Sequence, residues 1–323
     1  MMRRNLFHAP LALAAFLALS IPASAAATGT FERTLTVTGP VELEVGTGSG
    51  DIAVREGAAG RVRVVAHISA SGWLFWSPDP AQVREVEQNP PIRQLGNRVV
   101  IGTAVRKWNN IGISYEIEAP GDTRLRASTG SGSVQITGLR GPVNLSTGSG
   151  DIAAVRIGNG IEARTGSGSI SVDAADGAVN GSTGSGDVKV AAASGDVYIS
   201  SGSGSLQVKA SRGMVRARTG SGDIHVDGAV RDVDVHTGSG SLRIDGEPGA
   251  AHWKLETGSG DVNVRLPSQS SFALDAHSGS GGIQSKHRLI TQGAVRENQL
   301  KGTAGNGSAQ LYIRTGSGSI QID

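Results

Sequence analysis

The sequence contains no cysteine and few aromatic residues, and its charges nearly balance. Without cysteine there can be no disulfide bond, no thiolate chemistry and no lipid-anchored cysteine at a mature N-terminus. Aromatic residues make up only 4% of the chain, which is little for a thick globular core and sufficient for a thin one. The 30 Lys and Arg residues are matched by 28 Asp and Glu residues, so the charge gives no sign of nucleic-acid or membrane binding.

The first 25 residues have the features of a secretory signal peptide. The charged segment 1–4 precedes an apolar run at 11–21, and the Ala-Ser-Ala triplet at 23–25 provides a small-residue cleavage site. The apolar run is too short to span a bilayer, and no later run is long enough for a membrane helix. The pair Arg3 and Arg4 leaves twin-arginine export open as a second route. We therefore expect an exported protein of the periplasm or the cell surface.

A short glycine-rich tag, Thr-Gly-Ser-Gly-Asp or a close variant, recurs throughout the chain. Its first residues are Thr47, Thr129, Thr147, Thr165, Thr183, Ser201, Thr219, Thr237, Thr257, Ser278 and Thr315. From Thr129 to Thr237 the tags follow one another at a constant step of 18 residues. A fixed short period indicates one supersecondary unit that stacks on copies of itself.

Each 18-residue unit contains two short segments in which apolar and polar residues alternate. In one unit the apolar pairs are Val188 with Val190 and Val197 with Ile199. A spacing of two places such side chains on one face of a β-strand. We predict an all-β fold, a parallel β-solenoid (β-helix or β-roll) with coils of 18 residues and a thin core of Val, Ile and Leu. The sequence leaves the handedness open, although right-handed coiling is the default for parallel crossovers.

The tags are expected to form the corners of the coils. Their two glycines supply backbone freedom, and the threonine shares the parity of the inward apolar positions, so its hydroxyl should satisfy the turn backbone. The fifth position alternates between Asp and Ser, which we interpret as charge avoidance, with each Asp accepting a hydrogen bond from a neighbouring Ser hydroxyl. The corner residues assigned in this way are Thr147, Gly148, Gly150, Asp151, Thr183, Gly184, Gly186, Asp187, Thr219, Gly220, Gly222 and Asp223.

The period divides the chain into five segments. After the signal peptide at 1–25, residues 26–66 are expected to form the first strands and the first coil. Residues 67–123 break the period, and we predict an irregular lobe or cap there, with a short helix and strands. Residues 124–277 form the regular solenoid, and residues 278–323 form an excursion followed by the final coil.

Four aromatic residues are candidate contact residues for a partner. Trp73, Phe75 and Trp76 lie in the segment that breaks the period. They either cover the exposed strand edges at one end of the solenoid or form a contact patch for a protein or a glycan. Tyr198 is the one exposed aromatic residue on the outward positions of the regular coils, which are otherwise mixed and polar.

The tags, the strand end Tyr115–Pro120 before the repeats and the closing segment Arg314–Ile320 resemble those of a known bacterial family. This is the β-strand-repeat "putative adhesin" family, a domain of unknown function. The similarity covers nearly all of the expected mature chain, and the tags are specific to the family. The resemblance implies an exported β-solenoid and adhesion at a surface, and it offers no catalytic residues to transfer.

The interpretation that these patterns favour is a non-enzymatic structural or binding protein of the bacterial cell envelope, without a cofactor or a bound metal. Its partner would be an envelope or surface component, either protein or glycan, and no nucleic acid is expected. The ligand, the anchoring and the oligomeric state stay open.

Three alternatives remain. A polysaccharide-active β-helix enzyme would need an acid and a base in a groove. The one adjacent carboxylate pair is Asp227 and Asp245, whose charge Lys209 and Arg265 are expected to compensate. A calcium-binding roll would place Asp two residues after the glycine, whereas here Asp follows it directly. Ice binding would need outward threonines. The histidines His225, His236 and His252 are too scattered in the sequence to predict a metal site.

Overall fold

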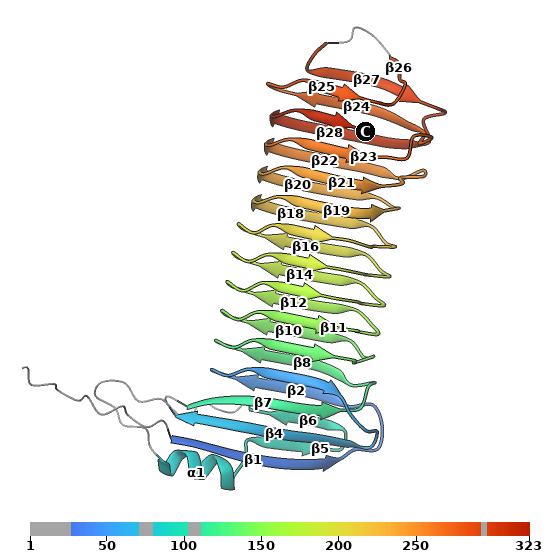
Figure 1. The fold of residues 1–323 in the computed structure, drawn as a ribbon. Helices are drawn as coiled ribbons and strands as arrows, with labels where there is room; N and C mark the ends of the chain where they lie inside the picture. Colours follow the sequence, from blue (N-terminus) through green and yellow to red (C-terminus); the bar gives the residue numbers. More distant parts are fainter. Residues whose placement is uncertain (1–26, 71–79, 103–110, 292–295) are drawn as a thin grey trace, which may run out of the picture.

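The computed structural model describes residues 27–70, 80–102, 111–291 and 296–323. The chain winds into one long stack of coils with two facing sheets, as the sequence predicts for a parallel β-solenoid (Figure 1). In the described residues the one helix is α1 (Pro80–Gln88), which lies at the N-terminal end of the stack. The predicted signal peptide at 1–25 and the aromatic residues Trp73, Phe75 and Trp76 lie outside the described residues.

Two open sheets run the length of the stack. Sheet A has 14 strands, in spatial order β1 (Ala27–Thr36), β4 (Arg61–Ala70), β7 (Ile111–Ala119), β3 (Ile52–Glu56), β9 (Val134–Thr137), β11 (Ile152–Val155), β13 (Ile170–Val172), β15 (Val188–Val190), β17 (Leu206–Val208), β19 (Ile224–Ala229), β21 (Leu242–Gly246), β23 (Val262–Arg265), β29 (Ile320–Ile322) and β25 (Ile283–Ser285). Sheet B has 15 strands, in spatial order β26 (Ile290–Thr291), β27 (Gln299–Ala304), β24 (Phe272–Ser278), β28 (Ala309–Ser317), β22 (His252–Ser259), β20 (Val233–Ser239), β18 (Val215–Ser221), β16 (Val197–Ser201), β14 (Val179–Thr183), β12 (Ile161–Thr165), β10 (Val143–Thr147), β8 (Arg124–Thr129), β2 (Glu42–Thr47), β6 (Arg98–Ile101) and β5 (Ile92–Leu95).

The 18-residue period of the sequence determines which residues pair between neighbouring strands. Val143 pairs with Ile161, Ile161 with Val179, and Val179 with Val197, each a step of 18 residues. These side chains point inward and are buried, so they form the thin aliphatic core that the alternation predicts. One coil is longer, because Trp253 pairs with Val233. The indole is buried as predicted, and its Nε1 donates a hydrogen bond to the carbonyl of Arg231 at 2.9 Å.

The tag threonine joins each coil to the coil beneath it. From Thr129 onward its side chain is buried, and its hydroxyl donates to the carbonyl of the second tag glycine on the neighbouring coil. Thr47 instead donates to the carbonyl of Ser49 in its own tag. For Thr183 the acceptor is Gly168 at 2.8 Å, and the same oxygen accepts from the Gly186 amide at 3.1 Å. The glycines allow this close approach, since a Cβ on Gly186 would lie 2.0 Å from the Gly168 carbonyl oxygen.

The Asp and Ser positions of the tags also bond between coils, in a different way from the expectation. Asp151 Oδ1 accepts from the backbone amide of Ser169 at 2.8 Å, and Asp187 Oδ1 accepts from the amide of Ser205 at 2.9 Å. The serine hydroxyl acts as an acceptor in turn, from the Asp187 amide to Ser169 Oγ at 3.3 Å. The donor to Asp is therefore an amide and not the predicted hydroxyl. A corner amide has no other ladder partner, and a carboxylate one coil below is placed to accept from it.

At the N-terminal end the spatial order of the coils departs from the chain order. Strands β2 and β3 pair directly with β8 and β9 of the regular coils. Strands β6 and β7, which come later in the chain, within 67–123, form a coil on the outer side of β2 and β3. Antiparallel β4 and β1 then extend sheet A. Helix α1 packs on β1 with Val83 and Val86 buried, and Glu87 Oε1 accepts from the Thr30 amide at 2.8 Å. The helix thus satisfies part of an otherwise open strand edge.

The C-terminal end shows the same exchange of order. Strands β28 and β29 form the last coil in the chain, yet they insert between the coil of β22 and β23 and the strands β24 and β25. Antiparallel β27 and the two-residue strand β26 then cover β24 (Figure 1). The coil that closes the sequence is therefore an inner coil, held on both sides.

Replacing the tag threonine tests the corner. Thr183→Val keeps the shape and removes the hydroxyl, leaving the Gly168 carbonyl and the Gly186 amide without this partner. We expect a loss of about 1–3 kcal/mol in the free energy of unfolding, measured by chemical denaturation. Thr183→Ser is the matched control and should be nearly neutral, because Ser201 occupies the equivalent corner of the next coil with the same bond. Equal losses in both variants would contradict the role of the hydroxyl.

Calcium should leave the stability of the chain unchanged. The Asp carboxylates of the tags each accept a backbone amide from the next coil, and Ser separates one Asp from the next along the stack. Millimolar calcium is therefore expected to leave the unfolding midpoint within experimental error. A large rise would show that the tags bind the ion and would overturn the charge-avoidance interpretation.

Candidate functional site

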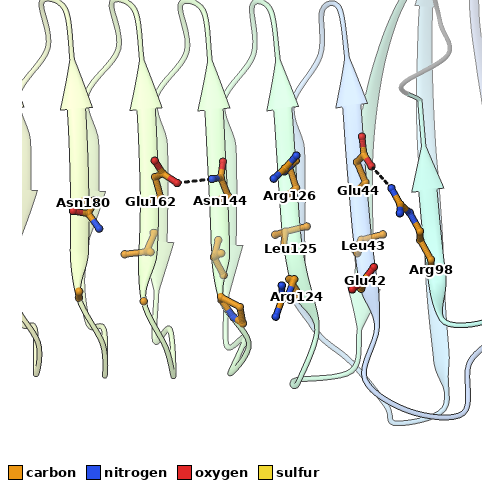
Figure 2. A pocket seen from close by; sticks show the side chains of 15 residues that line it. Glu42, Leu43, Glu44, Arg98, Arg124, Leu125, Arg126, Asn144, Glu162 and Asn180 are labelled. Atoms are coloured by element: carbon orange, nitrogen blue, oxygen red, sulfur yellow. Dashed lines mark hydrogen bonds and ion pairs between the residues drawn. The ribbon is translucent and has the colours of Figure 1, made fainter.

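A shallow hollow of about 520 Å³ lies on the outer face of sheet B, near the N-terminal end of the regular coils (Figure 2). It extends over β6, β2, β8, β10, β12 and β14. Its lining residues are Glu42, Leu43, Glu44, Arg98, Arg124, Leu125, Arg126, Pro142, Val143, Asn144, Gly160, Ile161, Glu162, Ala178 and Asn180. The shape of this surface comes from the residues at the outward positions of these strands.

The hollow exists because short outward residues follow long ones. On β8 the outward positions carry Arg124 and Arg126, whereas the next coils carry Asn144 and, at the start of β12 and β14, Gly160 and Ala178. Strands in register are about 4.8 Å apart, so a row of short side chains leaves a depression beside the arginines. Leu43, Leu125 and Val143 point into the core beneath, so the strand backbone lies under the depression.

Some charged side chains in the hollow have a partner of opposite charge or a hydrogen-bond partner, and others do not. Arg98 pairs with Glu44 at 3.5 Å, and Asn144 Nδ2 donates to Glu162 Oε2 at 2.6 Å, as Figure 2 shows. Arg124 and Arg126 are exposed on β8, and within the described residues neither forms an ion pair. Two guanidinium groups on one strand thus keep their donors available at the edge of the hollow.

A second hollow of about 240 Å³ continues along the same face and shares Glu162 and Asn180 with the first. Arg164, Tyr198, Arg216 and Arg218 line it with them. We call the two hollows together the arginine groove. Its lining includes the six arginines Arg98, Arg124, Arg126, Arg164, Arg216 and Arg218 and the three glutamates Glu42, Glu44 and Glu162.

Tyr198, a candidate contact residue from the sequence, lines this second hollow and is half-buried there. The Arg216 guanidinium lies 5.8 Å from the centre of its ring, and the hydroxyl is 3.4 Å from Asp196 Oδ2. Arg216 and Arg218 both pair with Asp234, at 2.9 and 3.2 Å. This end of the arginine groove is therefore more neutral than the end that carries Arg124 and Arg126.

The carboxylate pair that the sequence offers to an enzyme lies on the other face. Asp227 on β19 and Asp245 on β21 belong to sheet A, together with His225, whose Nε2 is 2.6 Å from Asp227 Oδ1. Asp245 is compensated by Arg243 at 3.4 Å and by Arg265 at 3.9 Å. Lys209, expected to share in this compensation, forms no ion pair among the described residues. Four hollows on the described residues, the two on sheet B among them, do not include His225, Asp227 or Asp245.

His236 and His252 lie on β20 and β22 of sheet B, away from His225. The structure therefore separates the three histidines, as their scatter in the sequence predicts, but it adds two carboxylates to His225. The sequence prediction did not include Arg124 and Arg126. Leu125 and Ala127 alternate with the two arginines, so the sequence shows that the arginines point outward. That short side chains lie beside them on the next coils becomes clear only when the register of the strands is known.

Comparison with known proteins concerns the fold and the family. Residues 159–323 match the family model described as Toastrack DUF4097. No curated protein is significantly similar in sequence. Among the described residues, no helix has the length and apolar character needed to cross a membrane.

Several solved structures resemble the chain at low identity. A "putative adhesin" from Bacteroides fragilis is 12% identical over 91% of this chain and 97% of that one, with a TM-score of 0.40. A "putative lipid binding protein" from Parabacteroides distasonis is 13% identical over 91% and 96%, with a TM-score of 0.39. A "putative cell adhesion protein" from Clostridium sporogenes is 14% identical over 91% and 99%, with a TM-score of 0.26. Since the family model spans more than half of the sequence, the chain belongs to the Toastrack DUF4097 family.

Proposed function

We propose that the chain is an exported, non-enzymatic binding protein of the cell envelope, and that its arginine groove holds an extended acidic polysaccharide. The observation that carries the proposal is the pair Arg124 and Arg126, exposed beside the larger hollow and without an ion pair in the described residues. Export rests on the signal peptide predicted at 1–25. The role is adhesin-like, since the protein would hold a surface polymer without changing it.

The dimensions of the arginine groove favour a linear partner. It crosses β6, β2, β8, β10, β12, β14, β16 and β18, which at strand spacing corresponds to a length of about 34 Å. Both hollows are shallow and open, so a compact small molecule would bury little of its surface there. A chain of several sugars could instead contact successive coils and add up weak contacts.

The chemistry of the arginine groove favours carboxylate groups on that partner. A guanidinium presents a planar fork of donors that matches a carboxylate in a bidentate manner. Asn144 and Asn180 lie beside the arginines and offer amide groups for sugar hydroxyls. The three glutamates of the groove reduce its net charge, so a polymer with spaced carboxylates fits better than one with a phosphate at every unit.

Two of the three carboxylates in the groove are engaged with arginine, which favours binding over catalysis. Glu44 pairs with Arg98, and Glu162 pairs with Arg164 and accepts from Asn144. A glycosidase needs one carboxyl group that stays protonated and a second that stays ionised across the scissile bond. Glu44 and Glu162 are both engaged with arginine side chains, so neither is free to face a glycosidic oxygen.

Removing the free arginines tests the proposal. Arg124→Ser together with Arg126→Ser should weaken binding of polygalacturonate at least tenfold in biolayer interferometry at 0.15 M salt, because two charge-assisted contacts are lost. The matched control is Lys189→Ser with Lys209→Ser, which removes the same charge from an exposed position on β15 and from another directly after β17. It should change binding less than twofold, and neutral dextran should not bind. Equal binding by both double variants, or no binding of the polymer by the parent chain, would refute the proposal.

A further inference from the structure

A second cluster of chemically active side chains lies on the outer face of sheet A, outside the arginine groove. His225 and Asp227 stand two residues apart on β19, so both point outward, and Asp245 stands on the neighbouring strand β21. One donor atom from each of the three residues lies within 4.8 Å of the other two. The set combines an imidazole nitrogen with two carboxylates.

A β-bulge lies within the cluster. Val226 pairs with Ile244 and Ala229 with Gly246, so Asp227 and Gly228 together face the single residue Asp245. Gly228 adopts a φ of 69°, which a glycine adopts without strain. A bulge bends the strand and redirects its side chains. In this case Asp227 is placed against both His225 and Asp245.

Asp245 carries an oxygen that has no hydrogen-bond partner in the described part of the chain. Its Oδ1 is inaccessible to solvent, and the nearest cationic atom is Arg265 Nε at 3.9 Å. Its other oxygen, Oδ2, contacts Arg243 Nε at the long distance of 3.4 Å. An inaccessible carboxylate oxygen without a donor is costly, and a bound cation would satisfy it. Both arginine side chains are about half exposed and free to turn towards solvent.

We propose that His225, Asp227 and Asp245 bind a divalent first-row transition metal, with zinc as the probe. Zinc accepts imidazole nitrogen and carboxylate oxygen at about 2.0–2.2 Å, which places donor atoms within about 3–4 Å of one another. The cluster reaches this spacing by small side-chain rotations, because its donor atoms already lie within 4.8 Å. Calcium takes oxygen ligands, so the imidazole disfavours it.

The metal would act on two neighbouring coils at once. His225 and Asp227 belong to the coil of β18 and β19, whereas Asp245 belongs to the coil of β20 and β21. Binding would therefore cross-link the stack and neutralise two carboxylates that the register sets side by side. Three protein ligands leave at least one coordination position for water or for a donor group of a partner. This site is independent of the arginine groove and of the polysaccharide proposed for it.

Zinc titration tests the site, using the full chain without an added affinity sequence. Isothermal calorimetry measures binding, and thermal unfolding measures stabilisation. We expect zinc to bind and to raise the unfolding midpoint, and His225→Gln and Asp245→Asn each to weaken binding more than tenfold. His236→Gln is the matched control, since its histidine is also on an outward strand position near a single carboxylate, Glu256. It should bind zinc as the parent chain does.

Arg265→Gln is a variant that should strengthen zinc binding instead of weakening it. It removes the cation nearest to Asp245 Oδ1, so zinc should bind more tightly. A merely structural cluster would show no such gain. Absence of zinc binding by the parent chain, or binding that persists unchanged in both His225→Gln and Asp245→Asn, would overturn the proposal. Calcium at the same concentrations should produce neither heat nor stabilisation.

Discussion

The hydrogen bond from a buried tag hydroxyl to a glycine carbonyl on the neighbouring coil is the interaction on which the rest of the stack depends. It follows the order of coils in space and not the order in the chain. Thr129 reaches Gly50, Thr315 reaches Gly260, and Ser278 reaches Gly318. A slip of one residue between coils would break this bond and turn the aliphatic positions to solvent. The corner therefore fixes the register, and the register fixes the core.

Because the regular core holds the coils together, the residues on the outer face are not needed for the fold. Inward positions must pack into the core of each coil, as at Val188 and Leu206, whereas outward positions need only tolerate water. Both proposed sites lie on outward positions. The arginine groove arises where long and short side chains alternate between coils, and the His225 cluster arises where a bulge interrupts one ladder.

The ends of the stack show how the protein protects its strand edges. Sheet edges left open invite pairing with other chains. Here the outermost strands of sheet B are short, four residues in β5 and two in β26, and α1 covers part of β1 on sheet A. At each end the chain places one coil out of order, so that β2 with β3 and β28 with β29 are enclosed. Unfolding from an end must then begin with the caps and not with a free coil.

The sequence alone predicts what depends on local pattern. The inward parity of Val197 and Trp253, the buried tag threonines and the parallel register all follow from spacing. The position of β28 between β22 and β24 does not, because any tag-bearing coil fits any other and the choice depends on the caps. Arg124 and Arg126 are visibly outward, but the room beside them depends on residues of later coils, such as Asn144 and Asn180, which lie 18 and 54 positions after Arg126. The 18-residue step predicts the pair Asp227 and Asp245, whereas the bulge at Asp227 and Gly228 shows in no period.

The enclosed C-terminal coil offers the most direct test of this account. Hydrogen–deuterium exchange, followed by mass spectrometry, compares peptides from residues 309–323 with peptides from the central residues 188–208. The account predicts equal protection of the two regions, although 309–323 ends the chain, because β28 and β29 have hydrogen-bonded neighbours on both sides. Rapid exchange of 309–323, typical of a fraying terminus, would contradict the enclosed order of the coils.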